Sequence, residues 1–149
     1  MRAARQVNAM KAVFEVRRLQ ELAAEKAAAK AAEALRSAQA GCDERSRQLR
    51  SDQEDWARTV TDASLGLPVA ALWARQVAQS EAAVKSAEAE VDAAERHNRT
   101  RSDEWSAALA RSETASELAQ AVFRSAKRAR EEAALNELTD RASRSGAAR

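Results

Sequence analysis

The residues that interrupt helices gather at one place in this chain, near its midpoint. Gly66 and Pro68 lie close together, and the rest of the chain consists almost entirely of good helix formers. Gly66 permits a left-handed backbone turn, and Pro68 suits the first turn of a helix, where its missing N–H is no loss. We therefore expect one helix over about residues 3–62, a turn over about 63–67 and a second helix over about 68–143.

The composition favours helices packed through a thin core. The chain of 149 residues has 39 alanines, no isoleucine and no tyrosine, and charged residues make up 32% of it. Without alanine, too few apolar side chains remain to fill a compact globule of this size. The formal net charge is only +2 and helix breakers are rare, which also disfavours disorder. By length, residues 1–149 are expected to form a single domain.

Apolar side chains recur every seven residues along both predicted helices, which is the signature of a coiled coil. From Val7, every seventh residue is Val7, Phe14, Glu21, Ala28, Leu35, Cys42, Leu49, Trp56 and Ala63, and eight of these nine are apolar. In the second helix the series is Val77, Val84, Val91, Asn98 and Trp105, with a companion series of Trp73, Ala87, Ala94, Ala108, Ala115 and Val122. A short turn makes the helices antiparallel neighbours. The expected fold is all-α, a long two-helix antiparallel coiled-coil hairpin.

Folding the chain about Gly66 predicts which residues face each other. Paired residue numbers should add up to about 133, so Asn98 falls opposite Leu35. Asn98 is either a polar register device in the seam or a side chain that rotates outward. The same register leaves roughly the last 17 residues without an intramolecular partner. Leu135 and Leu138 lie there at helical spacing, which indicates either a partner-binding segment or a polar, frayed tail.

Residues that could carry out catalysis are scarce. The only histidine, His97, lies in a charged stretch and is expected to face solvent. The only cysteine, Cys42, falls on the seven-residue series, so we interpret it as a small core residue. Neither a metal-ligand set nor a nucleophile with its base is present, and no phosphate-binding glycine loop occurs. We expect no enzymatic activity, no cofactor and no metal.

The calculated pI of about 9.0 raises the possibility of nucleic-acid binding. Acidic and basic residues are mostly interleaved, however, as in Glu81/Lys85 and Asp92/Arg96, and no aromatic platform or continuous basic stripe accompanies them. Nucleic-acid binding is therefore a remote interpretation. No apolar run is long enough for a membrane span or a signal peptide, which predicts a cytoplasmic protein.

Positive charge is concentrated at both ends of the chain. Residues 1–18 hold five basic residues and one acidic residue, and residues 124–149 hold seven basic residues and four acidic ones. A hairpin brings both termini to one end, which would carry the excess. That end either orients the protein against an acidic partner or consists of ordinary solvated helix ends.

Three tryptophans are many for so thin a core. Trp56 and Trp73 flank the predicted turn, where they could pack together and hold it closed. Alternatively, Trp73 contacts a partner, because exposed tryptophan is enriched in binding hot spots. A two-stranded coil covers a tryptophan incompletely, so we expect part of at least one to face solvent.

The layout resembles the FliJ family, the small stalk proteins of flagellar type III export, and their injectisome counterparts. Residues 13–22 (VFEVRRLQEL) resemble the opening helix of the family, and residues 105–111 (WSAALAR) resemble a tryptophan-centred stretch of its second helix. Residues 128–132 (RAREE) and 136–142 (NELTDRA) are similar to its basic-acidic run and its closing motif. The resemblance spans nearly the whole chain in length and in the position of the turn.

The resemblance implies a stalk that inserts its terminal end into the hexameric export ATPase, promotes ATPase assembly and couples it to the membrane export gate. Export chaperones are further implied partners, and the location would be cytoplasmic, peripheral to the inner-membrane export apparatus. The alternatives are an injectisome stalk and a generic coiled-coil scaffold. The implied ATPase-binding residues are Phe14, Arg17, Arg18, Arg124, Arg128, Arg130, Leu135 and Leu138. The implied gate-binding residues are Trp73, Gln76, Val77, Ser80 and Val84.

Overall fold

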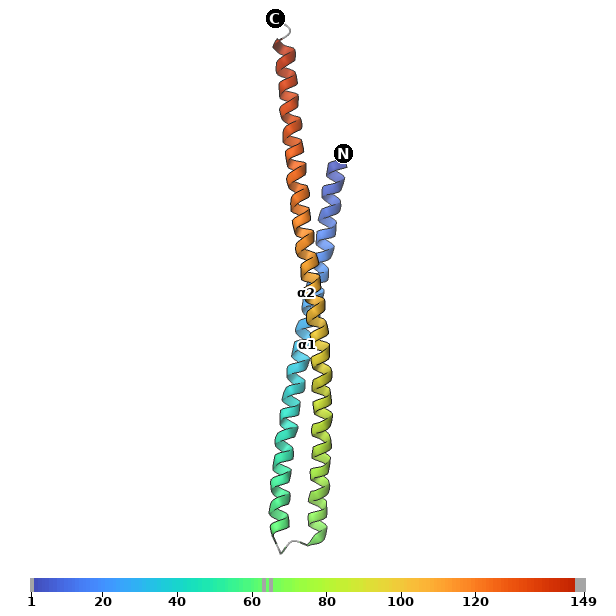
Figure 1. The fold of residues 1–149 in the computed structure, drawn as a ribbon, viewed down its shortest axis with the longest axis vertical. Helices are drawn as coiled ribbons and strands as arrows, with labels where there is room; N and C mark the ends of the chain where they lie inside the picture. The colour runs from blue at the N-terminus through green and yellow to red at the C-terminus, as the bar shows by residue number, and fades with distance from the viewer. Residues whose placement is uncertain (1, 63, 65, 147–149) are drawn as a thin grey trace. The chain divides into compact units, whose positions relative to one another are not determined.

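The computed structural model describes residues 2–62, 64 and 66–146, and the side chains of residues 2, 3, 145 and 146 are not described. It contains two α-helices, α1 (Arg2–Thr61) and α2 (Leu67–Gly146), joined by a short connection (Figure 1). The helices pack against each other, and no strand occurs within the described ranges. The predicted all-α, two-helix hairpin is therefore confirmed.

The end of α1 and the start of α2 are held by local hydrogen bonds. The Asp62 carboxylate accepts hydrogen bonds from the backbone N–H and the hydroxyl of Ser64, at 3.0 and 2.6 Å. These bonds hold the pKa of Asp62 below its ordinary value, with the Ser64 hydroxyl as the main cause. At the start of α2, the Gly66 carbonyl accepts from the backbone N–H groups of Val69 and Ala70, at 3.0 and 3.4 Å.

Gly66 does not use the backbone freedom that its missing side chain allows. No described glycine has a positive φ, so Gly66 does not adopt the left-handed conformation that glycine permits. Gly66 instead stands immediately before α2, where its carbonyl receives the first hydrogen bonds of that helix. Pro68 lies in the first turn of α2, where its missing N–H is not needed. Positions 63 and 65 of the predicted turn lie outside the described residues.

The contacts divide the hairpin into two compact units. One, the terminal unit, comprises Met1–Ala24 with Glu104–Arg149. The other, the turn unit, comprises Glu25–Asp103 and contains the connection between the helices. Each unit has a segment of α1 packed on a segment of α2. The expectation of a single domain stays a prediction.

The buried and half-buried residues of the described chain repeat every three and four positions, as a heptad seam requires. The buried hydrophobic residues of the described chain are all alanines, namely Ala31, Ala87, Ala108 and Ala115. Alanine brings helix backbones close together but removes little apolar surface from water. The core is therefore thin, and most large apolar side chains lie outside it.

Candidate protein-binding surfaces

In the terminal unit, α1 covers α2 through alternating apolar and charged positions. Phe14 and Arg17 are both half-buried, whereas Arg18 is exposed. On one side of the seam, Arg17 lines a groove of about 370 Å³ together with Met10, Val13 and residues of α2. On the other side, Phe14 and Arg18 line a second groove. The structure thus distributes these three predicted ATPase-binding residues over both sides of α1.

The end of α2 has no part of α1 beside it. Ala126 is the last half-buried position, and every side chain over residues 127–144 is exposed. Figure 1 shows this segment, which we call the C-terminal extension (residues 127–144), continuing past the start of α1. Leu135 and Leu138 are 63% and 61% exposed. The predicted extension without a covering helix is therefore present.

Three predicted arginines lie on or next to the C-terminal extension. Arg124, Arg128 and Arg130 are all exposed, and none of them makes an ion pair in the described structure. Arg124 and Arg128 line one shallow concavity on α2. The ion pairs that do form in the extension are long and exposed, at 3.8 Å for Lys127–Glu131 and 3.9 Å for Arg141–Glu137. Exposed ion pairs of this length contribute little to stability. Arg124, Arg128 and Arg130 belong to neither pair, so their side chains are open to contact with another molecule.

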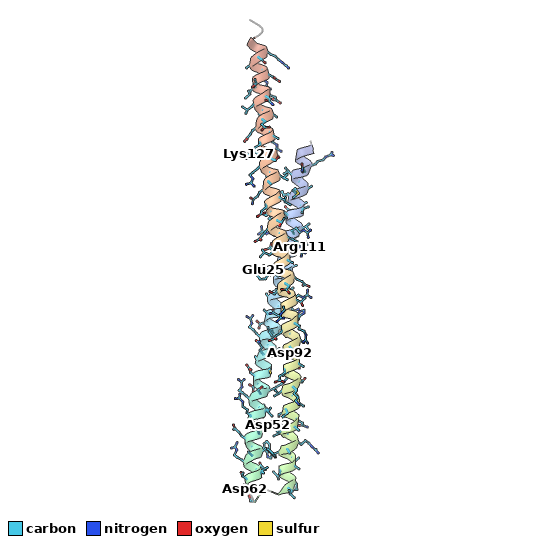
Figure 2. All side chains as sticks on the ribbon, viewed as in Figure 1. Glu25, Asp52, Asp62, Asp92, Arg111 and Lys127 are labelled. Atoms are coloured by element: carbon cyan, nitrogen blue, oxygen red, sulfur yellow. The ribbon has the colours of Figure 1, made fainter. Side chains whose placement is uncertain are left out.

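In the turn unit, a buried carboxylate joins the two helices. Asp52, which is labelled on α1 in Figure 2, is only 4% exposed. It accepts hydrogen bonds from three side chains. The Ser80 hydroxyl of α2 donates to Oδ2, the Gln76 amide donates to the same oxygen at 3.3 Å, and the Gln48 amide donates to Oδ1 at 2.8 Å. We call these four residues the Asp52 cluster. They bind α1 to α2 by polar rather than apolar contact.

The hydrogen bonds of the Asp52 cluster favour the ionised carboxylate. The pKa of Asp52 lies below its ordinary value, chiefly because the Ser80 hydroxyl donates to it and then because Gln48 does. Burial acts in the opposite direction, and Gln76 lowers the pKa further. A second link between the helices, the Arg45–Glu90 ion pair at 3.6 Å, is exposed. The residue numbers of the Asp52–Ser80 and Arg45–Glu90 pairs add up to 132 and 135, which is close to the predicted sum of about 133.

Four of the five predicted gate-binding residues lie on the seam instead of on an open surface. Ser80 is buried against Asp52, and Trp73, Val77 and Val84 are half-buried at heptad positions. Gln76 alone is exposed, and its amide is engaged by Asp52. The structure therefore gathers these residues along one stretch of α2, but it offers only part of that stretch to another molecule.

An exposed apolar surface lies next to that stretch, on both sides of the connection. Val60, Leu67 and Leu72 are 56%, 87% and 65% exposed. Leu72 and Val69 line a concavity of about 440 Å³ together with Trp73 and residues of the Asp52 cluster. Reasoning from the sequence missed this surface, although the apolar residues around Gly66 were a visible signal.

The tryptophans agree with the expectation of incomplete cover. Trp56 is 39% exposed, and Trp73 is half-buried. That the two pack together to close the turn stays a prediction. Asn98 is half-buried at its heptad position, which favours a place in the seam over outward rotation.

The remaining candidate residues have the surroundings expected of structural residues. His97 is exposed, and Cys42 is a half-buried free thiol on the seam. The described part of the chain holds no group of three or more histidine, cysteine, aspartate or glutamate side chains that could bind a metal ion. Within the same part, neither helix is long and apolar enough to cross a membrane.

No protein-family model, no curated protein and no solved structure matches this chain.

Proposed function

We propose that this chain is a non-enzymatic stalk of a type III protein export apparatus, as its resemblance to the FliJ family implies. In this role the terminal unit binds a hexameric export ATPase and promotes its assembly. A stretch early in α2 contacts the membrane export gate. The protein works in the cytoplasm at the inner-membrane export apparatus, in a flagellar or an injectisome system.

The observation that carries the proposal is the uncovered C-terminal extension. A helix with Leu135 and Leu138 more than half exposed gains nothing from those side chains in the isolated chain. The exposed arginines Arg124, Arg128 and Arg130 add positive charge to the same end. Apolar anchors beside unpaired arginines suit a partner surface with an apolar pocket and acidic neighbours.

The proposed gate contact depends on what α2 leaves accessible near the connection. Ser80 is bound to Asp52, so it cannot contact the gate while the Asp52 cluster is intact. Gln76 and the flank of Trp73 are accessible next to the exposed Leu72. We propose that the gate is recognised through this flank, with Val77 and Val84 supporting it from the seam.

Binding to the export ATPase of the same cell tests the proposal. Full-length chain should promote ATPase assembly and turnover, and a chain ending at Ala129 should not. Leu135→Ala with Leu138→Ala should weaken binding by roughly tenfold or more with unchanged helicity, because each leucine removes apolar contact area. Leu67→Ala is the matched control, since Leu67 is 87% exposed in the other unit.

Each result has a definite meaning. Loss of binding in the truncated chain, with retention in the control, supports the stalk and assigns ATPase binding to the C-terminal extension. If neither the full chain nor the truncated chain binds the ATPase, the resemblance reflects only coiled-coil composition. A generic coiled-coil scaffold then becomes the better interpretation.

A further inference from the structure

The Asp52 cluster contains a buried negative charge without a counter-ion. Asp52 is 4% exposed, and its carboxylate is ionised at neutral pH because hydrogen bonds lower its pKa. The donors are the neutral side chains of Ser80, Gln76 and Gln48. The carboxylate makes no ion pair with any residue that the structure describes. Neutral donors recover only part of the cost of removing a carboxylate from water, so a cation at this position would be stabilised strongly.

The carboxylate can be reached through the concavity of about 440 Å³ in the turn unit. Asp52 lines this concavity together with Val69, Leu72, Trp73 and Gln76. Its volume lies in the range of roughly 300–1,000 Å³ that is usual for ligand sites. No other charged side chain of the described chain lines it. A single carboxylate among apolar and aromatic groups suits a cation that carries apolar neighbours.

The basic side chains nearest in sequence do not fill the concavity. Arg58 forms an ion pair with a neighbouring aspartate of α1. Arg50 precedes Asp52 by two residues, which places it about 200° around the helix. Arg75 follows Trp73 by two residues and is placed in the same way on α2. The chain therefore supplies no counter-ion of its own, and the missing cation has to come from another molecule.

The acceptors in the concavity suit a guanidinium group. An ionised carboxylate has about four acceptor sites, and three donors occupy the carboxylate of Asp52. The donor of Gln76 is 3.3 Å away, which is the longest of the three hydrogen bonds, so an incoming N–H can replace it. A guanidinium has five such donors in one plane, stacks on aromatic rings and is more weakly hydrated than an ammonium group. Trp73 supplies the aromatic ring.

We infer that the concavity beside Asp52 binds an arginine side chain of a partner protein, whose guanidinium pairs with the Asp52 carboxylate and stacks on Trp73. The apolar residues next to that arginine contact Leu72 and Val69. Binding supplies the counter-ion that the buried carboxylate lacks in the isolated chain. The site requires only this chain, whereas the assignment of the arginine to the membrane export gate rests on the proposed function.

Titration of the full chain with the blocked peptide acetyl-Leu-Arg-Leu-amide tests the site. Binding is followed by proton–nitrogen NMR through the indole N–H signal of Trp73, which Trp73→Phe identifies by its loss. The signal should shift and reach saturation. The same peptide with citrulline in place of arginine keeps the shape but lacks the charge, so it should bind more weakly by roughly tenfold or more. The lysine peptide should also bind more weakly than the arginine peptide.

Variants of the chain test which residues form the site. Asp52→Asn removes the charge with little change in size and should weaken binding of the arginine peptide by roughly tenfold or more. Asp55→Asn is the matched control, because Asp55 lies one turn further along α1 and does not line the concavity. Leu72→Ala leaves the Asp52 cluster intact and should weaken binding about threefold or more, since Leu72 is 65% exposed in the free chain. Circular dichroism checks that each variant stays helical.

Three results would overturn the inference. They are an indole signal that never moves, a citrulline peptide that binds as tightly as the arginine peptide, and unchanged binding by a helical Asp52→Asn chain. Equal binding of the lysine peptide would overturn the choice of arginine. The peptide measurements contain no export protein, so their failure leaves the proposed function standing. If the arginine peptide binds as expected but the export gate protein of the same cell does not bind the full chain, the site stands and the proposed gate contact fails.

Discussion

Gly41 is the position where a single methyl group should stabilise this protein most simply. It lies inside α1, within the turn unit, with no positive φ. A Cβ added there would meet no other heavy atom within 4 Å, apart from the helix's own nearby backbone. Glycine in a helix interior is about 0.8–1.0 kcal/mol less favourable than alanine. Since no clash offsets that gain, Gly41→Ala should raise the free energy of unfolding by about 1 kcal/mol.

Urea and thermal unfolding followed by far-ultraviolet circular dichroism measure this change. The midpoint temperature should rise by about 2–4 °C, and the dependence of the free energy on urea should stay the same. Ala40→Gly is the matched control, because Ala40 is the preceding residue of the same helix and is exposed. It should lower the free energy of unfolding by about 1 kcal/mol. Combining the two substitutions moves the glycine by one residue and should restore wild-type stability.

Two results would refute this reasoning. If Gly41→Ala lowers stability, a neighbour must approach that face of α1 more closely than the structure shows. If Gly41→Ala and Ala40→Gly each behave as expected but the double variant does not return to wild type, the two positions are coupled. The change then cannot be assigned to helix propensity alone.

Two further perturbations probe the seam. Ala87 is 1% exposed, so Ala87→Leu should cost about 1–3 kcal/mol of stability by overpacking, measured by urea unfolding. The same substitution at the exposed Ala89 should change stability by less than about 0.5 kcal/mol. The second perturbation concerns Asp52, whose pKa is lowered by hydrogen bonds in the folded state. Its carboxylate therefore adds to the free energy of unfolding at any pH above its pKa in the unfolded chain, and this contribution is lost as the pH falls through the pKa of the folded state. The Asp52→Asn variant should therefore lose less free energy of unfolding than the wild-type chain as the pH is lowered. Part of the loss should remain, because the pKa of Asp62 is also lowered in the folded state. An unchanged acid limb in Asp52→Asn would contradict the assignment.

The hairpin was predictable because its signals are local. Helix propensity acts on each residue, and the only concentrated interruption of it, at Gly66 and Pro68, marks the connection. The seven-residue series through Phe14, Leu35 and Leu49 matched the half-buried face of α1. Periodicity identified that face because a covered stripe must recur at the helical repeat.

The Asp52 cluster was not predictable in the same way. Asp52 lies on the seam seven residues before the buried Thr59, but an apolar criterion passes over both. The donor Ser80 is 28 residues away from Asp52 in sequence, so only the fold reveals that the carboxylate is satisfied. The prediction of gate-binding residues overlooked the Asp52 cluster for the same reason. It chose a stretch of α2, but the sequence does not show which side of that stretch faces α1.

The conformation of Gly66 could not be predicted from the sequence, for a different reason. Glycine tolerates a left-handed backbone, but tolerance does not require it, and here the residue stands immediately before α2 without a positive φ. The sequence shows which conformations are open to a residue, and the neighbouring hydrogen bonds select among them.

The distribution of apolar side chains gives a reason to expect partners that does not depend on any family. The buried hydrophobic residues of the described chain are all alanines, whereas leucines such as Leu19, Leu72, Leu135 and Leu138 are at least 61% exposed. Single exposed leucines are ordinary on protein surfaces. Here, however, the larger side chains would stabilise the hairpin more if they occupied the seam, because burial scales with apolar area. Their place on outer faces therefore costs the isolated chain stability and gains contact area only when another helix or protein covers them.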